Sequence, residues 1–199
     1  MDNAIWEGYR ELSGSTESEK LGNLIFKFDL KFLIIERSFL EYAIIDHIII
    51  FVCKRRTSDM YTALDFAKYI VKKCIDDGQP ISNLQLQKIL FYIQKDFLQR
   101  DQLAFCDEIE AWQFGPVVPN VYYHYCGYGA MNITHNSEDL LLDGATARIV
   151  NPIIEGKRVL SPWTMVAETH KPNGAWDRTY CNGNGNRHTI PTELIKTAG

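Results

Sequence analysis

The chain has 199 residues, 46% of them hydrophobic, which is enough to bury one core and indicates one domain or one domain with an extension. Its formal net charge is −4, from 21 basic and 25 acidic residues, and this balance excludes the basic surface with which proteins grip a nucleic-acid backbone. The 5 cysteines include no C-x-x-C pair, so we expect neither a disulfide scaffold nor a zinc site. We expect a cytoplasmic location. The most apolar stretch, residues 43–53, is shorter than the roughly 20 apolar residues of a membrane helix, and we expect no secretory signal and no membrane partner.

The first 59 residues carry local signals that disagree with one another. Residues 26–32 alternate apolar and polar side chains like a strand, whereas residues 39–56 have neither helical nor strand spacing. One interpretation is a genuine extension that forms a hairpin or a helix. The other, which we favour, is that residues 1–59 are non-native or poorly ordered and that the protein starts at Met60, because cap and turn signals agree only from there. The predicted domain is therefore 60–199.

Two capping boxes mark the first helices of this domain. In TALD, residues 62–65, the Thr62 side chain can accept from the backbone N–H of Asp65 while Asp65 reaches back. SNLQ, residues 82–85, repeats the pattern, so we predict one helix that ends near residue 76 and a second that reaches about Gln99.

Each of these helices has one apolar face. In the first helix, the residues at helical spacing are Leu64, Ala67, Val71 and Cys74. In the second, they are Leu86, Ile89, Leu90, Ile93 and Phe97. The spacing predicts that Lys88, Tyr92 and Lys95 face away from the core or lie along its edge.

A small β-hairpin is expected next. Two short extended runs, 103–105 and 109–114, flank the acidic turn 106–108. Gly115 and Pro116 are expected to end the second strand. The fold class predicted is therefore mainly α with a small β-hairpin, in a compact multi-helix domain.

The rest of the chain is read as short helices and one loop. Pro119, suited to a first helical turn, opens a helix over 119–125. Residues 130–144 form a long loop, which we take as a candidate contact surface. The later predicted helices are 145–158, kinked or broken at Pro152, 161–170 with Ser161 as N-cap, 175–180, and 191–196.

Aromatic side chains gather around the hairpin. Trp112 and Phe114 are two apart, so on a strand they share one face, either packed in the core or exposed to anchor a partner. In the helix that follows, one of Tyr122 and Tyr125 is expected to pack inward while Tyr123 faces outward. Part of this cluster is a candidate protein-binding surface.

Thr169, His170 and Trp176 lie where one predicted helix ends and the next begins. A histidine in a last helical turn can complement the negative end of the helix dipole, and this is the role that we expect for His170. Metal binding is not expected, because no other histidine or cysteine stands at ligand spacing.

Catalysis is not predicted. Glu108 and Glu110 share a strand face and are more economically explained as a solvated hairpin edge than as an acid–base pair. Cys126 near His124 has no evident third group to orient a base, and there is no phosphate-binding glycine loop. We therefore expect no enzyme activity, no catalytic residue, no metal and no cofactor.

Three blocks of the sequence resemble a known family. LQLQKILFYIQKDFL, then EIEAWQFGPVVPNVY, then WTMVAETHKPNGAWDRTY occur in the order found in the Panacea domain of SocA-like antitoxins, which are also met as phage-associated proteins of the GepA type. The resemblance runs from about Tyr61 to Gly199. Family members commonly begin near the position of Met60, so the amino-terminal 59 residues depart from the pattern.

The resemblance implies an antitoxin of a bacterial or phage-borne toxin–antitoxin pair, without catalytic activity or cofactor. The implied partner is a protein toxin encoded by the adjacent gene, and at least one family member delivers its toxin to an ATP-dependent protease. The candidate toxin-binding or family-motif positions are Lys88, Tyr92, Trp112, Phe114, Gly115, Pro116, Val117, Tyr122, Tyr123, Thr169, His170 and Trp176.

A DNA-binding repressor of its own operon is the alternative. Two capped helices followed by a hairpin are loosely similar to a winged helix, and Gln85, Gln87 and Gln94 on the second helix could read bases. Against this, that helix offers few basic side chains, and a recognition helix needs several. Nucleic acid is therefore not the expected partner.

Overall fold

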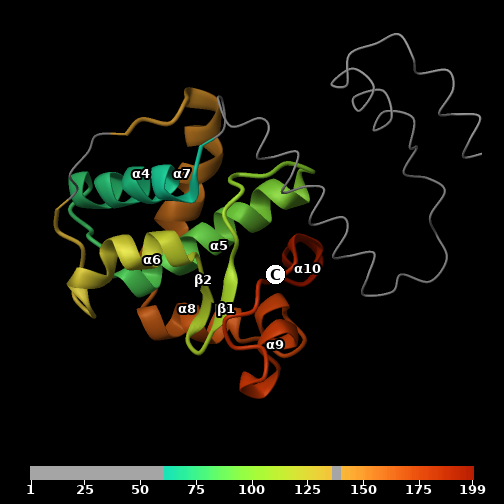
Figure 1. The fold of residues 1–199 in the computed structure, drawn as a ribbon. Helices are drawn as coiled ribbons and strands as arrows, with labels where there is room; N and C mark the ends of the chain where they lie inside the picture. Colours follow the sequence, from blue (N-terminus) through green and yellow to red (C-terminus); the bar gives the residue numbers. More distant parts are fainter. Residues whose placement is uncertain (1–60, 136–139) are drawn as a thin grey trace, which may run out of the picture. The chain divides into compact units, whose positions relative to one another are not determined.

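A computed structural model describes residues 61–135 and 140–199, so the strand expected at 26–32 and the stretch at 39–56 lie outside the described residues. The described part is mainly helical with one two-stranded antiparallel sheet, which confirms the predicted fold class (Figure 1). Its elements are α4 (Ala63–Asp76), α5 (Asn83–Gln99), β1 (Glu110–Trp112), β2 (Gly115–Val117), α6 (Pro119–Tyr125), α7 (Gly144–Arg158), α8 (Pro162–Thr169), α9 (Ala175–Tyr180) and α10 (Thr192–Ala198), with short 3₁₀ turns at Cys126–Tyr128 and Cys181–Gly183. No helix in this part of the chain is both long enough and apolar enough to span a bilayer.

Both predicted capping boxes are present. The Thr62 side chain accepts from the Asp65 backbone N–H, and the Ser82 side chain does the same for Gln85, while each third residue reaches back to the cap. The inward face of α4 includes Phe66 and Ile70, which the predicted stripe omitted, and Leu64 is only partly buried.

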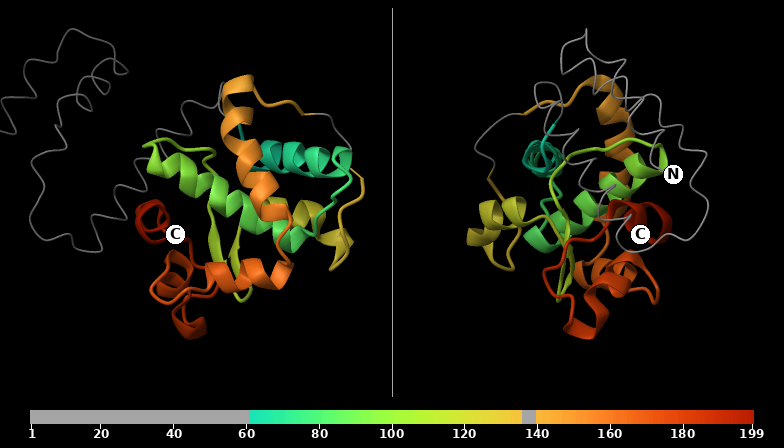
Figure 2. Two further views of the ribbon diagram at one scale, coloured as in Figure 1. Left: turned by 180° about the vertical axis from the view of Figure 1, so that it is seen from behind. Right: turned by 45° about the vertical axis from the view of Figure 1, so that its right-hand side comes forward.

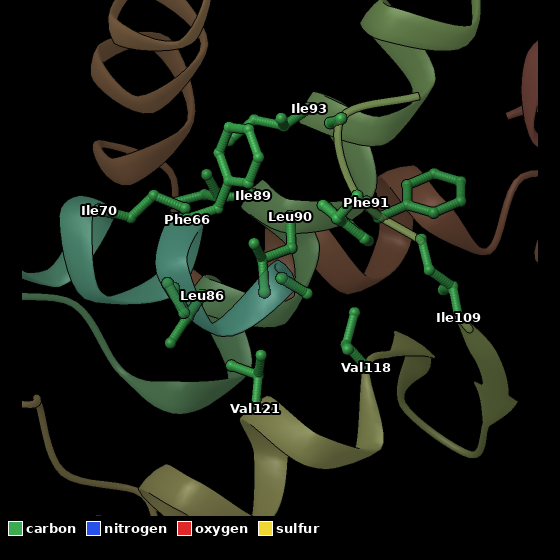
Figure 3. Close-up of a cluster of buried hydrophobic side chains, with 14 of the residues drawn as sticks. Phe66, Ile70, Leu86, Ile89, Leu90, Phe91, Ile93, Ile109, Val118 and Val121 are labelled. Atoms are coloured by element: carbon green, nitrogen blue, oxygen red, sulfur yellow. The ribbon is translucent and has the colours of Figure 1, made fainter. Parts of the chain in front are cut away.

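Helix α5 lies at the centre of the fold. It contacts α4, α6, α7, α8, α10 and β2, with α4 on one side of it and the hairpin, α8 and α9 on the other (Figures 1 and 2). Its apolar side chains pack against α4, against the start of β1 and against the approach to α6 (Figure 3). The side chains labelled in that core are Phe66, Ile70, Leu86, Ile89, Leu90, Phe91, Ile93, Ile109, Val118 and Val121.

Because α5 is surrounded, its polar side chains are buried as well, and they bind backbone groups of other segments. Gln94 accepts from the N–H groups of Ala104 and Phe105 and donates to the Phe105 carbonyl. Gln87 accepts from the Val118 N–H at 2.9 Å. Buried polar groups are costly without partners, so these amides fix the loops around the helix.

The hairpin is present, but not where it was predicted. β1 pairs with β2 in the register Glu110–Val117, Ala111–Pro116 and Trp112–Gly115, so Gly115 and Pro116 are inside the second strand and do not end it. Residues 103–105 form no strand and are held by Gln94.

The position of Pro116 explains why a proline is tolerated there. Its pairing partner Ala111 directs its own N–H and carbonyl to the other side of β1, where they bond His188 and Arg187 at 2.8 and 2.7 Å. The Ala111–Pro116 pair therefore exchanges no hydrogen bonds, and the missing N–H of proline costs nothing. Residues 187–190 thus cover the second edge of β1.

The remaining predictions were correct in outline. Helix α6 begins at Pro119, Ser161 caps α8, and α10 follows Pro191. The break predicted at Pro152 as one of two outcomes is absent, because α7 continues through this residue. The described residues of the 130–144 loop are not all at the surface, because Ile133 is fully buried and its N–H bonds Ile81.

Candidate functional site

Lys88 lies inside the protein, so the prediction that it faces away from the core or lies along its edge is wrong. Its side chain is 0% exposed, and Nζ donates to the Pro116 carbonyl at 3.0 Å. Helical spacing alone assigned this side of α5 to solvent, whereas β2 and α8 cover it. Burial disfavours the charged amine and lowers the pKa of Lys88 from 10.5 to about 7.

Gly115 is in contact with this amine. Its φ of +101° is a conformation that other residues rarely adopt. A β-carbon at this position would come within 2.8 Å of both Lys88 Cε and Thr169 Oγ1. The close approach therefore requires glycine, for backbone and for packing reasons together.

The end of α8 and the start of α9 close the other side of the site. The imidazole of His170 stacks on the Trp176 indole, with ring centroids 3.5 Å apart and an interplanar angle of 3°. Trp176 Nε1 donates to the Trp112 carbonyl at 2.8 Å, and its ring also stacks on Tyr180. Trp176 thereby ties α9 to β1.

The structure does not support a charged His170 at the end of α8. His170 is the C-cap of that helix, but burial, and after it the neighbouring Lys88 amine, lower the pKa of its imidazole below the usual 6.5. A neutral ring contributes little to the helix dipole, and its role here is stacking. Its buried Nε2 has no hydrogen-bond partner among the described residues.

These contacts unite residues that are far apart in sequence. We call the group the Lys88 cluster; its members are Lys88, Gly115, Pro116, Thr169, His170 and Trp176. Val117 is also buried, as the last residue of β2.

A second group, the aromatic surface, lies over β1 and α6. The Trp112 ring is 4.9 Å from that of Tyr122 and 6.1 Å from that of Tyr123, and the Arg187 guanidinium lies 4.7 Å from the Trp112 centroid. Tyr123 is 55% exposed, whereas Tyr125 is buried, as the spacing predicted. Trp112 is only partly buried, so it is neither a core residue nor a fully exposed residue.

Phe114 is not part of the strand that carries Trp112, so the prediction that the two residues share a strand face is wrong. The strand ends at Trp112, and Phe114 stands in the two-residue turn, where period-two alternation no longer applies. It is 48% exposed and packs edge-on against Trp163 on α8, which is itself 65% exposed. These two residues form a separate exposed aromatic pair at the tip of the hairpin.

Sequence reasoning missed Trp163 and Arg187. No local signal marks Trp163 as exposed, because it stands three residues before the buried Val166, a spacing typical of one helix face. Arg187 belongs to a glycine- and asparagine-rich segment and has a positive φ of 67°, which sequence alone does not indicate. Both are placed by the hairpin they contact.

Tyr92 belongs to a polar cluster that joins α5, α7 and α8. Its hydroxyl donates to Glu168 Oε2 at 3.0 Å, and Lys157 Nζ contacts the same oxygen at 2.6 Å and lies 3.9 Å from the Tyr92 ring centroid. Burial and the Glu168 carboxylate raise the pKa of Tyr92, so the hydroxyl remains a donor. A part for Tyr92 in partner binding stays a prediction.

Glu108 and Glu110, the acidic pair considered for catalysis, each accept a hydrogen bond from a different side chain. Glu110 accepts from the Trp112 indole N–H at 2.7 Å, and Glu108 accepts from Thr189 at 3.2 Å. In residues 61–135 and 140–199, no group of three or more histidine, cysteine, aspartate or glutamate side chains is arranged to hold a metal ion.

The alternative of a DNA-reading helix loses its structural basis in α5. Gln85, Gln87 and Gln94 are buried, and Gln85 donates to the carbonyls of Arg158 and Leu160. A recognition helix must present such side chains to a groove. α5 instead forms the core.

Comparison with known proteins places the Lys88 cluster and most of the aromatic surface inside one matched region. Residues 86–177 match the family described as antitoxin SocA-like, Panacea domain. The antitoxin SocA of Caulobacter vibrioides (strain NA1000 / CB15N) is 35% identical over 119 residues, which cover 53% of this chain and 63% of that relative. The matched part thus spans less than two thirds of the relative's length. No solved structure matches the chain.

Proposed function

We propose that this protein, in which residues 86–177 carry a SocA-like Panacea domain, is a cytoplasmic antitoxin that neutralises a protein toxin by binding it directly. The observation that carries the proposal is the aromatic surface, together with the Phe114–Trp163 pair at the hairpin tip. Large exposed aromatic side chains on a well-packed domain are typical of surfaces that meet another protein.

The position of these side chains suits a binding surface. Trp112, Tyr122 and Tyr123 contact one another, and the hairpin that carries Trp112 and Phe114 is held to α5 by buried hydrogen bonds. A surface that is ordered before binding loses little conformational entropy when the partner arrives. The mechanism that follows is occlusion, in which the antitoxin covers the toxin's working surface or holds the toxin for an ATP-dependent protease.

The toxin is, on this proposal, the product of the adjacent gene. Tyr123→Ala tests the surface. Because Tyr123 is 55% exposed, the melt should stay within about 0.5 kcal/mol of wild type, while toxin binding weakens by about 1 kcal/mol or more. The measurements are growth rescue on co-expression with the adjacent gene, and a thermal melt of each variant.

Leu141→Ala is the matched control for Tyr123→Ala. Leu141 is exposed to 76% but stands in the 130–144 loop, which contributes no residue to the aromatic surface, so this variant should melt and rescue normally. The reverse pattern, with Tyr123→Ala rescuing fully and Leu141→Ala failing, would move the interface to the loop and contradict the aromatic surface.

We further propose that residues 60–199 fold and act as an antitoxin domain without residues 1–59. Helices α4 and α5 take their caps from within this segment, at Thr62 and Ser82. A truncated protein that starts at Met60 is expected to show a cooperative melt and to rescue growth as the full chain does. Loss of the cooperative transition on truncation would show that residues 1–59 contribute to the fold.

A further inference from the structure

The Lys88 amine is buried, and no carboxylate of the described residues balances its charge. Among the described residues the amine has one hydrogen-bond acceptor, the Pro116 carbonyl at 3.0 Å, although an ammonium group carries three N–H donors. In the described part of the chain no carboxylate forms an ion pair with it, and burial is the one cause of its lowered pKa. A buried lysine in such a site is most stable when neutral.

The groups around the Lys88 amine come from β2 and from the end of α8. β2 contributes backbone at Gly115 and Pro116, and the end of α8 contributes the Thr169 hydroxyl and the His170 imidazole. On α9, Asp177 acts on His170 and favours its charged form, but this effect is smaller than that of burial or of Lys88. The titratable group of α8 that interacts with Lys88 is therefore a neutral histidine, which cannot balance a positive charge.

The amine also binds the hairpin at a point from which a small movement of β2 would displace the residues of the aromatic surface. Its acceptor, Pro116, pairs with Ala111 in the hairpin whose turn carries Phe114. In β1, Trp112 packs on Tyr122 and accepts at its carbonyl from Trp176. A shift of β2 away from α5 would therefore displace both the aromatic surface and Phe114.

We propose that Lys88 is a positioning residue for the toxin-binding surface: its buried amine holds the β1–β2 hairpin against α5 while it is neutral, and releases the hairpin when it takes up a proton. The inference rests on the proposed function. A neutral amine keeps its hydrogen bond to Pro116 and leaves no charge in the core. The ammonium form needs water or a counter-charge, and it reaches water only if the hairpin or the end of α8 moves.

The direction of the pH effect follows from the two states of Lys88. Between pH 7 and 10.5 the unfolded or released chain binds a proton that the closed state does not bind. The closed state is therefore favoured progressively as pH rises from about 7, and this advantage is absent below pH 7. The pKa of His170 lies below 6.5, so its protonation comes at lower pH and adds a second charge in the same direction.

Hydrogen exchange of the full chain tests the pH-dependent release of the hairpin without any toxin. Between pH 8.0 and 6.0, the neutral fraction of a group with a pKa near 7 falls about tenfold. After correction for intrinsic exchange rates, protection of amides in residues 110–118 is expected to fall about tenfold, while that of α4 stays constant. In Lys88→Met, which keeps most of the side-chain volume, this tenfold response of the hairpin should be lost. An equal response in both proteins, or none in wild type, would overturn the proposal.

A direct titration keeps the proposal testable if Lys88→Met does not fold. In the wild-type chain with ¹³C-labelled lysine, the Lys88 ε-carbon should titrate near pH 7. A midpoint near the ordinary 10.5 would exclude a neutral amine at physiological pH and would overturn the inference.

Binding to the purified product of the adjacent gene separates this inference from the proposed function. Wild type is expected to lose more affinity than Lys88→Met between pH 8.0 and 6.0, by up to about tenfold where the released hairpin predominates, because titration of the partner is common to both. Binding with the same pH dependence in both would refute Lys88 as a positioning residue and leave the antitoxin function intact. No binding at either pH would refute the proposed function itself.

Discussion

Gly115→Ala is expected to destabilise the protein by about 3 kcal/mol, which is a large fraction of the stability of an ordinary domain. Two costs combine at this position. Alanine is strained at the φ of +101°, which costs about 1–2 kcal/mol. Its β-carbon would also come within 2.8 Å of Lys88 Cε and Thr169 Oγ1, and overpacking a buried site costs about 1–3 kcal/mol.

Gly78→Ala separates these two costs. Gly78 also has a positive φ, of 68°, but an added β-carbon there meets nothing within 4 Å. This variant should therefore lose only the backbone term, about 1 kcal/mol. Urea denaturation followed by far-ultraviolet circular dichroism measures both. Equal losses for the two variants would contradict the close packing of Lys88 and Thr169 around Gly115.

Trp176→Ala is the second variant with a large expected effect, about 3–5 kcal/mol. Trp176 is 7% exposed, its ring is stacked between those of His170 and Tyr180, and its N–H satisfies the Trp112 carbonyl. Removing it leaves a cavity and an unpaired backbone oxygen. Trp112 is only partly buried, so its truncation should cost less.

Trp163→Ala provides a control with the same change of side chain. Trp163 is 65% exposed and contacts Phe114 edge-on, so its truncation should change the free energy of unfolding by less than about 1 kcal/mol. Circular dichroism is again the suitable probe, since tryptophan fluorescence changes with the substitution itself. A loss of stability at Trp163 as large as that at Trp176 would contradict the assignment of Trp163 to the surface.

The Lys88 cluster shows which features of this chain could be predicted from the local sequence and which depend on long-range contacts. The sequence singled out all six members as motif positions through the family resemblance, but as separate blocks. Their convergence on one amine depends on the packing of β2 and α8 against α5. Helical periodicity around Lys88 predicted the opposite orientation, because it cannot distinguish a helix covered on one side from a helix covered on all sides.

The sequence by itself determined the helices and their starting points. Each cap at Thr62, Ser82 and Ser161 joins groups within three residues of each other, so the local sequence is sufficient to predict these hydrogen bonds. Only the tertiary structure decided the hairpin and the burial of Lys88. Pro116 is acceptable in a strand because β1 turns its hydrogen bonds toward residues 187–190, about seventy positions later. A contact over that distance leaves no signal in the residues around Pro116, since its stability comes from packing that forms only when the chain folds.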